Sequence, residues 1–221
     1  MEGRQGCGLW FWFEYRQPII GWADTPPPRL QLRVVMDSRF FVGTRGLDEQ
    51  FLRIGLITDV NKWFWFAANS TFYVDRNLDT LAYQFETRLE IEPHFAGRIG
   101  PMTFDDRNRL EYRHRQPIET PSRTLAGFDR FRYRNLLRIN YEPAGAKWIP
   151  FVFNEWLFNL NVGFDQNRLA GGIARRLSSN VRLDGAYMWR AIRPNTTSPW
   201  SHDHLLLCYL YVGLPPKPVT H

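Results

Sequence analysis

Residues 81–94, LAYQFETRLEIEPH, alternate apolar and polar side chains along most of their length. The apolar positions of this segment hold Tyr83, Phe85, Leu89 and Ile91. The polar positions hold Gln84, Glu86, Arg88, Glu90 and Glu92. Alternation at every second residue is typical of a β-strand, whereas a helix, with about 3.6 residues per turn, would scatter both sets. The segment therefore predicts a strand with one apolar face and one charged face.

The same alternation recurs in ten further segments, and no long segment has the period of a helix. These segments are residues 9–16, 30–41, 50–58, 63–74, 107–115, 129–141, 148–158, 166–177, 181–190 and 204–212. Together they predict an all-β chain that forms a single domain over residues 1–221. Bacterial single-chain barrels normally have an even number of strands, so we expect about 10 to 12. One candidate is then miscounted or atypical, and we expect it at the N-terminus, where Pro26, Pro27 and Pro28 interrupt the pattern.

Helical membrane spans are excluded by the lengths of the apolar runs. A spanning helix needs about 20 consecutive apolar residues, and the longest run, residues 205–214, has about half of that. A chain of this composition that crosses a bilayer must cross it with strands. The N-terminus lacks the basic and apolar regions of a secretory signal, so we expect either that a signal has been removed or that the protein is not exported.

The chain has a formal net charge of +6 and a pI of about 9.6, values that often indicate a nucleic-acid partner. Of its 28 basic residues, however, only Lys62, Lys147 and Lys217 are lysine. Arginine suits fixed pairing with carboxylates in partly dehydrated places. The composition therefore favours internal ion pairs over a nucleic-acid partner, although residues 130–141 interleave arginine with aromatics as a single-strand binder does.

The connections between the predicted strands alternate in length from the third strand onward. Short turns are predicted at residues 60–62, 95–98, 143–146 and 178–180. Longer loops, rich in Pro, Gly, Asn and Ser, are predicted at residues 75–80, 116–127, 160–165 and 192–203. Short turns at one end and long loops at the other are the layout of an outer-membrane barrel.

Alternation does not by itself say which face points inward. A soluble sandwich or a lipocalin-like barrel puts its apolar face inward, whereas a membrane barrel turns that face to lipid. Long strands, a charged face that mixes arginine with glutamate, and large aromatics near strand ends favour the membrane barrel. The aromatics expected on the lipid-facing side are Trp63, Phe72, Phe95, Tyr141, Trp148, Trp189 and Tyr211. We therefore expect an antiparallel up-and-down transmembrane β-barrel in a bacterial outer membrane, surrounded by outer-membrane lipid.

The candidate site is a ladder of charged residues on the face predicted to line the lumen. Its members are Glu86, Arg88, Glu90, Arg107, Arg109, Glu111, Arg113, Arg130, Arg132, Arg134, Glu155 and Arg168. Interior charges must pair or be hydrated, so one interpretation is a salt-bridged plug that specifies strand register. The other is a polar pathway or anion site, because arginine outnumbers carboxylate on this face. This second interpretation predicts anion preference for a conducting lumen.

Other reactive side chains form no complete catalytic or metal motif. His202, Asp203 and His204 resemble a short metal motif, but two of them alternate across a strand start and the sequence places no third ligand, so we expect no metal and no cofactor. No nucleophile-elbow motif marks a serine, and no catalytic residue can be nominated. A disulfide between Cys7 and Cys208 is consistent with the sequence, which does not decide whether it forms.

Seven segments occur in an order, and with Glu and Arg placements, that are distinctive together. They are LWFWFEYR at 9–16, FETRLEIE at 85–92, NRLEYRHR at 108–115, RFRYRNLLRINY at 130–141, FVFNEW at 151–156, FDQNRLAGGIARRLSSNVRLDGAYMW at 164–189 and HDHLLLCYLYVGL at 202–214. In these segments the chain resembles a family of predicted bacterial outer-membrane barrels, domain of unknown function 2490. The resemblance covers most of the chain and implies a barrel fold and an outer-membrane location, and no established activity comes with it.

Three functional classes are consistent with these patterns. The first, which we favour, is a monomeric outer-membrane barrel with an Arg/Glu-lined interior and a structural, narrow-pore or small-solute role. The second is an outer-membrane barrel enzyme that acts on lipid. The third is a soluble lipocalin-like barrel that binds an apolar ligand.

Overall fold

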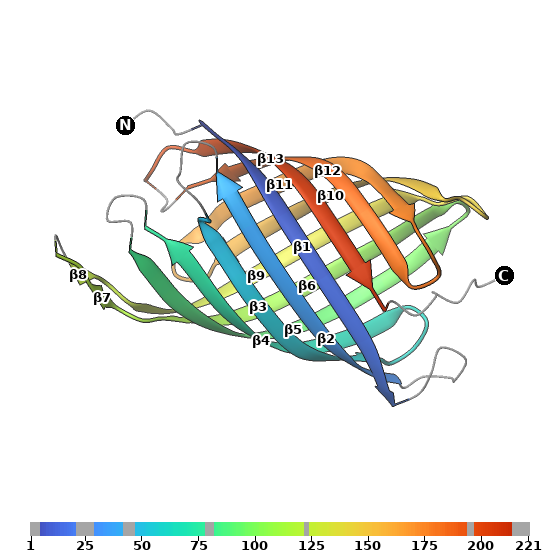
Figure 1. Ribbon diagram of the computed structural model, residues 1–221, viewed down its shortest axis with the longest axis horizontal. Helices are drawn as coiled ribbons and strands as arrows, with labels where there is room; N and C mark the ends of the chain where they lie inside the picture. The colour runs from blue at the N-terminus through green and yellow to red at the C-terminus, as the bar shows by residue number, and fades with distance from the viewer. Residues whose placement is uncertain are drawn as a thin grey trace.

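Eleven strands form one closed barrel in the computed structural model (Figure 1). The structure describes residues 5–20, 29–41, 47–77, 82–121, 124–193 and 197–213. The barrel strands are β1 Gln5–Ile20, β2 Arg29–Phe41, β3 Glu49–Asp59, β4 Phe64–Arg76, β5 Tyr83–Ile99, β6 Met102–Arg115, β9 Phe128–Tyr141, β10 Trp148–Asn159, β11 Gly163–Arg176, β12 Val181–Ile192 and β13 Ser201–Val212. The hairpin of β7 Ile118–Glu119 and β8 Thr124–Leu125 forms a separate small sheet in the link between β6 and β9. The prediction of an all-β barrel of about ten to twelve strands is confirmed. Within the described ranges, no helix is long and apolar enough to cross a membrane.

The barrel closes through a parallel contact between β1 and β13, whereas its other strand pairs are antiparallel. The parallel register runs from Gln5 opposite His202 to Tyr15 opposite Val212. In a chain that runs up and down, the first and last strands of an odd set point the same way, so their contact must be parallel. The prediction of an even strand number is therefore wrong, and β1 is atypical rather than miscounted. For the same reason β1 begins and β13 ends at opposite ends of the barrel (Figure 1).

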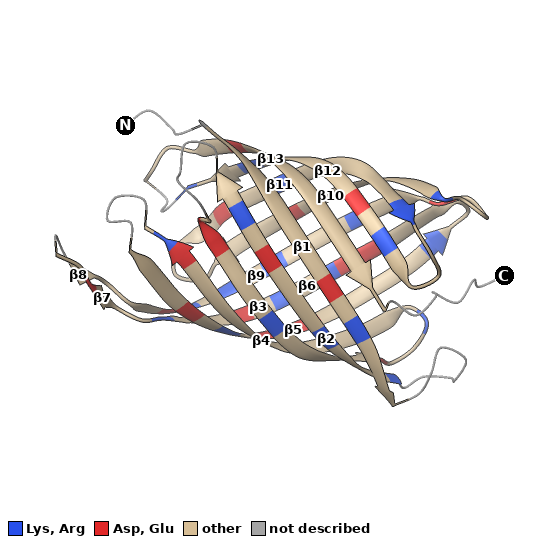
Figure 2. Cartoon of the chain, viewed as in Figure 1, with Lys and Arg blue, Asp and Glu red and all other residues tan. Residues whose placement is uncertain are grey.

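Strand β5 shows the orientation of the barrel wall. Phe85 and Leu89 are 57% and 61% exposed, whereas Glu86 and Glu90 are 1% and 2% exposed. The apolar face therefore points outward and the charged face points into the barrel, as predicted. A lipocalin-like barrel would bury Phe85 and Leu89 instead. Charged positions recur along the lengths of the strands and are not confined to their ends (Figure 2).

The links between strands differ at the two ends of the barrel. Short links at residues 60–63, 100–101, 142–147 and 177–180 define what we call the short-turn end. The β7–β8 hairpin projects from the opposite end, which we call the loop end (Figure 1). One predicted link is wrong in position and one is wrong in length, and at both a glycine with positive φ forms a tight turn. Strand β5 passes through the predicted turn at 95–98 and turns at Gly100, with φ 57°, and the link before Gly163, with φ 92°, is only residues 160–162.

Strand β10 is regular where the sequence predicts a bulge. Its buried and exposed positions alternate without interruption through residues 152–154. Ile149, Phe151 and Phe153 face inward and are buried, so this half of the strand is apolar on both faces. Where consecutive residues are all apolar, the sequence shows no alternation even though the strand itself is regular. The irregularity of register with β11 lies further on, between Leu157 and Phe158.

Most of the aromatics predicted on the lipid-facing side lie there. Five are exposed, namely Trp63, Phe72, Phe95, Tyr141 and Trp148. Trp189 is half-buried on the outer face, opposite the exposed Leu169. The prediction is wrong for Tyr211, which lies two residues after the buried Tyr209 and so shares its inward face.

Candidate functional site in the barrel lumen

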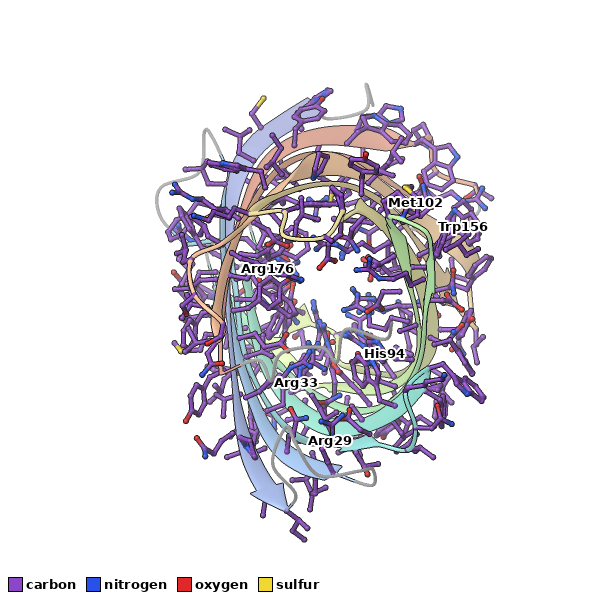
Figure 3. All side chains as sticks on the ribbon, turned by 90° about the vertical axis from the view of Figure 1, so that its right-hand side faces the viewer. Arg29, Arg33, His94, Met102, Trp156 and Arg176 are labelled. Atoms are coloured by element: carbon purple, nitrogen blue, oxygen red, sulfur yellow. The ribbon has the colours of Figure 1, made fainter. Side chains whose placement is uncertain are left out.

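The twelve residues of the predicted ladder all occupy inward-facing positions on β5, β6, β9, β10 and β11. Nine of them are buried, namely Glu86, Arg88, Glu90, Arg109, Glu111, Arg132, Arg134, Glu155 and Arg168. Arg107, Arg113 and Arg130 are half-buried. Figure 3, which looks into the barrel from the short-turn end, shows Arg33 pointing into the lumen and Trp156 pointing away from it.

A chain of ion pairs crosses four strands near the middle of the lumen. Arg109 on β6 pairs with Glu92 on β5 and lies 3.4 Å from the carboxylate of Glu111. Arg134 on β9 donates to Glu111 at 2.9 Å and to Glu155 on β10 at 2.7 Å. Each member of this chain has an opposite charge beside it, which is the condition under which buried charges are tolerated.

Single carboxylates in the lumen serve several arginines. Glu155 accepts hydrogen bonds from Arg107 at 2.8 Å, Arg134 at 2.7 Å and Arg168 at 2.8 Å. A second carboxylate, that of Glu86, lies in the same arrangement with Arg88, Arg113 and Arg115. Arg134 also pairs with Glu111, and Arg115 with Asp75, but the two other arginines of each group share one carboxylate. This leaves a local excess of positive charge, which attracts anions.

The ion pairs extend further around the barrel than the predicted ladder. Arg33 on β2 donates to Glu92 at 2.7 Å and to Glu14 on β1 at 3.1 Å. Arg53 on β3 pairs with Glu90 at 2.8 Å. Arg33 and Glu92 lie on the polar faces that the alternation predicts. Their positions in the every-second-residue pattern could therefore have identified them as inward-facing. Further inward pairs join Asp37 to Arg39, Asp184 to Arg138 and Arg182, and Asp203 to Arg190.

Arginine and glutamate line only part of the inner wall. The inward residues of β1 and β10 to β13 form an apolar cluster of Trp10, Ile149, Phe151, Phe153, Ala170, Ala174, Ala186, Met188, Leu205, Leu207 and Tyr209. These strands are apolar on both faces over much of their length, so their inner face could not be told from their outer face by period alone. The lumen therefore has a charged wall and an aromatic wall.

Arginine side chains of β9 also contact aromatic rings on the inner face. The guanidinium of Arg138 lies 3.7 Å from the centroid of the Phe151 ring. Arg130, for which the described residues give no ion pair, lies 4.4 Å from the centroid of the Phe128 ring. A cation over an aromatic face is attracted by the ring quadrupole, and more strongly when both are desolvated.

A cavity of about 150 Å³ lies between the charged and aromatic walls. Seven arginines, three carboxylates and His94 line it together with eight apolar or aromatic residues. Trp12 and Tyr209 belong to its aromatic side, whereas Arg107 and Arg168 belong to its charged side. His94 points into the lumen when viewed from the short-turn end (Figure 3). This cavity combines apolar contact with excess positive charge.

The histidines near the start of β13 do not converge on a metal site. His202 and His204 lie on the outer face, where Trp189 stacks on His202 with ring centroids 5.3 Å apart. Asp203 lies on the inner face and pairs with Arg190 at 2.6 Å. Within the described part of the chain, no cluster of three or more His, Cys, Asp or Glu residues could hold a metal ion.

Cys7 and Cys208 are free thiols on neighbouring strands. Cys7 lies opposite His204, and Cys208 lies opposite Phe11. Four residues of extended β1 therefore separate the two sulfur-bearing positions, or about 13 Å at the rise of a strand. That separation is too large for a disulfide.

A closed barrel with an apolar outer wall and ionised side chains inside defines the class of transmembrane β-barrels. The family model described as "Protein of unknown function (DUF2490)" matches residues 8–201, and the chain belongs to this family. A crystal structure of the beta domain of the Bordetella autotransporter Brka is similar in fold, with a TM-score of 0.53. The similarity covers 90% of this chain and 87% of that chain at 11% sequence identity, so it concerns the fold alone. No curated protein matches the chain.

Proposed function

We propose that this chain is a bacterial outer-membrane barrel with a narrow, anion-preferring lumen and a role in holding or passing small solutes. The apolar outer face of β5 and the fold shared with an autotransporter beta domain support the membrane location. A closed barrel also leaves no strand edge unpaired, as a bilayer requires. Outer-membrane lipid is then the surrounding medium of the wall.

The observation that carries the anion preference is the sharing of Glu155 by Arg107, Arg134 and Arg168. A pore lined by an excess of arginine lowers the energy of an anion in the lumen and raises that of a cation. The low dielectric of the wall strengthens this effect, because field lines are focused through the polar interior. Small anions should therefore outcompete cations of equal size.

Reconstitution in planar bilayers under a KCl gradient tests this proposal. The reversal potential should lie on the side of chloride selectivity. Arg107→Gln and Arg168→Gln should each shift it toward zero, whereas Lys62→Gln, which removes the same charge from an exposed turn, should leave it unchanged. Cation selectivity would contradict the proposal, and so would a lack of conductance, which would indicate a lumen sealed by its ion pairs.

A further inference from the structure

The lumen cavity has the chemistry of a binding site for an amphipathic anion. Trp12 and Tyr209 give it an aromatic side, with the two rings 6.0 Å apart in an edge-to-face arrangement. Arg107 and Arg168 line the other side, where they share the carboxylate of Glu155. Seven arginines and three carboxylates line the cavity, and four of these arginines also pair with Glu92, Glu111 or Asp184 behind the lining, so an excess of one positive charge remains. A ligand with an apolar body and one negative charge would contact both sides.

The volume of the cavity limits the size of such a ligand. At about 150 Å³ it matches an engineered apolar cavity of about the same volume that binds benzene. One six-membered aromatic ring therefore fits between the two walls.

Unpaired donors of the lining residues also favour an anion. The Nε1 of Trp12 and the Nε atoms of Arg33 and Arg134 are buried without a hydrogen-bond partner among the described residues. A buried donor without a partner is unfavourable, and an acceptor-rich ligand removes that penalty. A carboxylate offers only acceptors.

We propose that this cavity binds a monocarboxylate that carries one aromatic ring. The ring packs against Trp12 and Tyr209, and the carboxylate faces Arg107 and Arg168. This inference rests on the solute role proposed above, but binding and conductance are separate measurements. Binding without conductance would contradict the proposed conducting lumen and support the binding site. Conductance without binding would support the conducting lumen and contradict the binding site.

Calorimetry on the full chain in detergent, with benzoate as the probe, tests the site. Benzamide has the same shape without the charge, and acetate has the charge without the ring. Benzoate should bind at least roughly tenfold more tightly than either, since each lacks one of the two contacts. Equal affinity for benzamide or for acetate, or no binding of benzoate, would overturn the proposal.

A matched pair of variants places the binding in the lumen. Leu136 lines the cavity, and its neighbour Leu137 is 41% exposed on the outer wall. Leu136→Trp should fill the cavity and abolish benzoate binding, whereas Leu137→Trp should leave it unchanged. Arg107→Gln, which leaves the packing intact, should weaken binding by roughly tenfold if Leu136→Trp fails to fold. Unchanged binding in Arg107→Gln, or in a folded Leu136→Trp, would overturn the assignment.

A second inference comes from the outer wall, where polar side chains interrupt the apolar surface. They lie on β6, β9, β10 and β11 and are Asp106, Asn108, Asn135, Asn154 and Asn167, called here the amide patch. Asn135 donates to Asp106 at 2.6 Å and to Asn108 at 3.1 Å, and Asn167 donates to Asn154 at 3.0 Å. Each member is half-buried, and the exposed Leu137 and Trp156 lie between the two hydrogen-bonded groups of the patch.

The amide patch lies at the middle depth of the wall. Asn135 is seven residues from the start of β9 and six from its end. Asn154 is six residues from the start of β10 and five from its end. Amides and a carboxylate at this depth are unfavourable against acyl chains. Another polar surface is the better neighbour for them.

We infer that the amide patch is the interface of a two-fold dimer with a second copy of this chain. Each asparagine both donates and accepts hydrogen bonds, and Asp106 adds acceptors for the partner's amides. The patch is thus complementary to itself in hydrogen bonding, as an interface about a two-fold axis requires. Asparagine side chains also drive association of chains within membranes. The inference departs from the monomer expected from the sequence and rests on the proposed membrane location.

Native mass spectrometry of the chain released from detergent tests the dimer. Wild type should be dimeric, and Asn135→Leu and Asn154→Leu should each shift it to monomer. Ser70→Leu, on the outer face of β4 away from the patch, should remain dimeric. A monomeric wild type, or asparagine variants that stay dimeric, would overturn the interface. Flotation with lipid vesicles tests the membrane location separately.

Discussion

Arg33 Nη1 donates to Glu92 Oε1 at 2.7 Å, although the two residues are 59 positions apart and their strands, β2 and β5, are not neighbours. Both side chains are buried, at 3% and 0% exposure. The bond therefore passes over the inner faces of β3 and β4 and ties together two parts of the wall that share no ladder of backbone hydrogen bonds. Its contribution to stability can be measured.

Arg33→Met should destabilise the barrel, because it leaves the carboxylates of Glu14 and Glu92 buried with less compensation. Loss of one partner of a buried pair costs about 3–5 kcal/mol. Arg98→Met is the control, since Arg98 lies 3.8 Å from Glu142 at an exposed site, where a pair contributes less than about 1 kcal/mol. Urea unfolding in lipid vesicles measures the free energy of unfolding of both variants. Equal losses would contradict a stabilising role for the bond between Arg33 and Glu92.

The wall orientation predicts a large difference between neighbouring positions of β5. A fluorophore on Phe85→Cys should be quenched strongly by spin-labelled lipid, because Phe85 is 57% exposed on the outer face. The same fluorophore on Glu86→Cys should be quenched weakly, because Glu86 is buried in the lumen. Stronger quenching at position 86 would be incompatible with a membrane barrel.

Two adjacent glycines of β11 should respond differently to alanine. A Cβ on Gly172 would lie 2.2 Å from the carbonyl oxygen of Gly185 and 2.6 Å from the Cβ of Ala186, so the backbone would have to shift. A Cβ on Gly171 would meet only the carbonyl oxygen of Phe151, at 3.9 Å. Gly172→Ala should therefore lower the free energy of unfolding by about 1–3 kcal/mol, as overpacking does.

Gly171→Ala should be neutral or slightly stabilising, because alanine restricts the unfolded chain more than glycine does. The same urea titration measures both glycine variants. Similar changes in the free energy of unfolding at the two positions would show that the close approach of β11 to β12 does not restrict the size of residue 172.

The parallel contact of β1 with β13 should open more readily than the antiparallel contacts. Parallel pairing is slightly less stable per residue. Backbone amides of β1 and β13 that bond across this contact should therefore exchange with deuterium faster than those between β5 and β6. Hydrogen exchange followed by mass spectrometry compares the two directly, and slower exchange at the parallel contact would contradict this expectation.

The sequence alone determined where the strands lie and which face of most of them is charged. Residues 81–94 alternate because one side of β5 meets apolar surroundings and the other meets the lumen, and this constraint acts on each residue locally. The alternation at every second residue therefore assigned all twelve ladder residues to the charged face, which is the inner face of the barrel. It failed for Tyr211 and for residues 152–154, where both faces are apolar and no period remains to be read.

The tertiary structure decided the parallel closure, the aromatic wall and the partner of each charge. Closure depends on the number of strands and on the registers of all eleven pairs together, which no single segment carries. Arg33 meets Glu92 because the sheet curves until the inner faces of β2 and β5, with β3 and β4 between them, turn toward each other. A pattern with a period of two residues records the side of the sheet on which a residue lies, and it contains no information on what stands opposite.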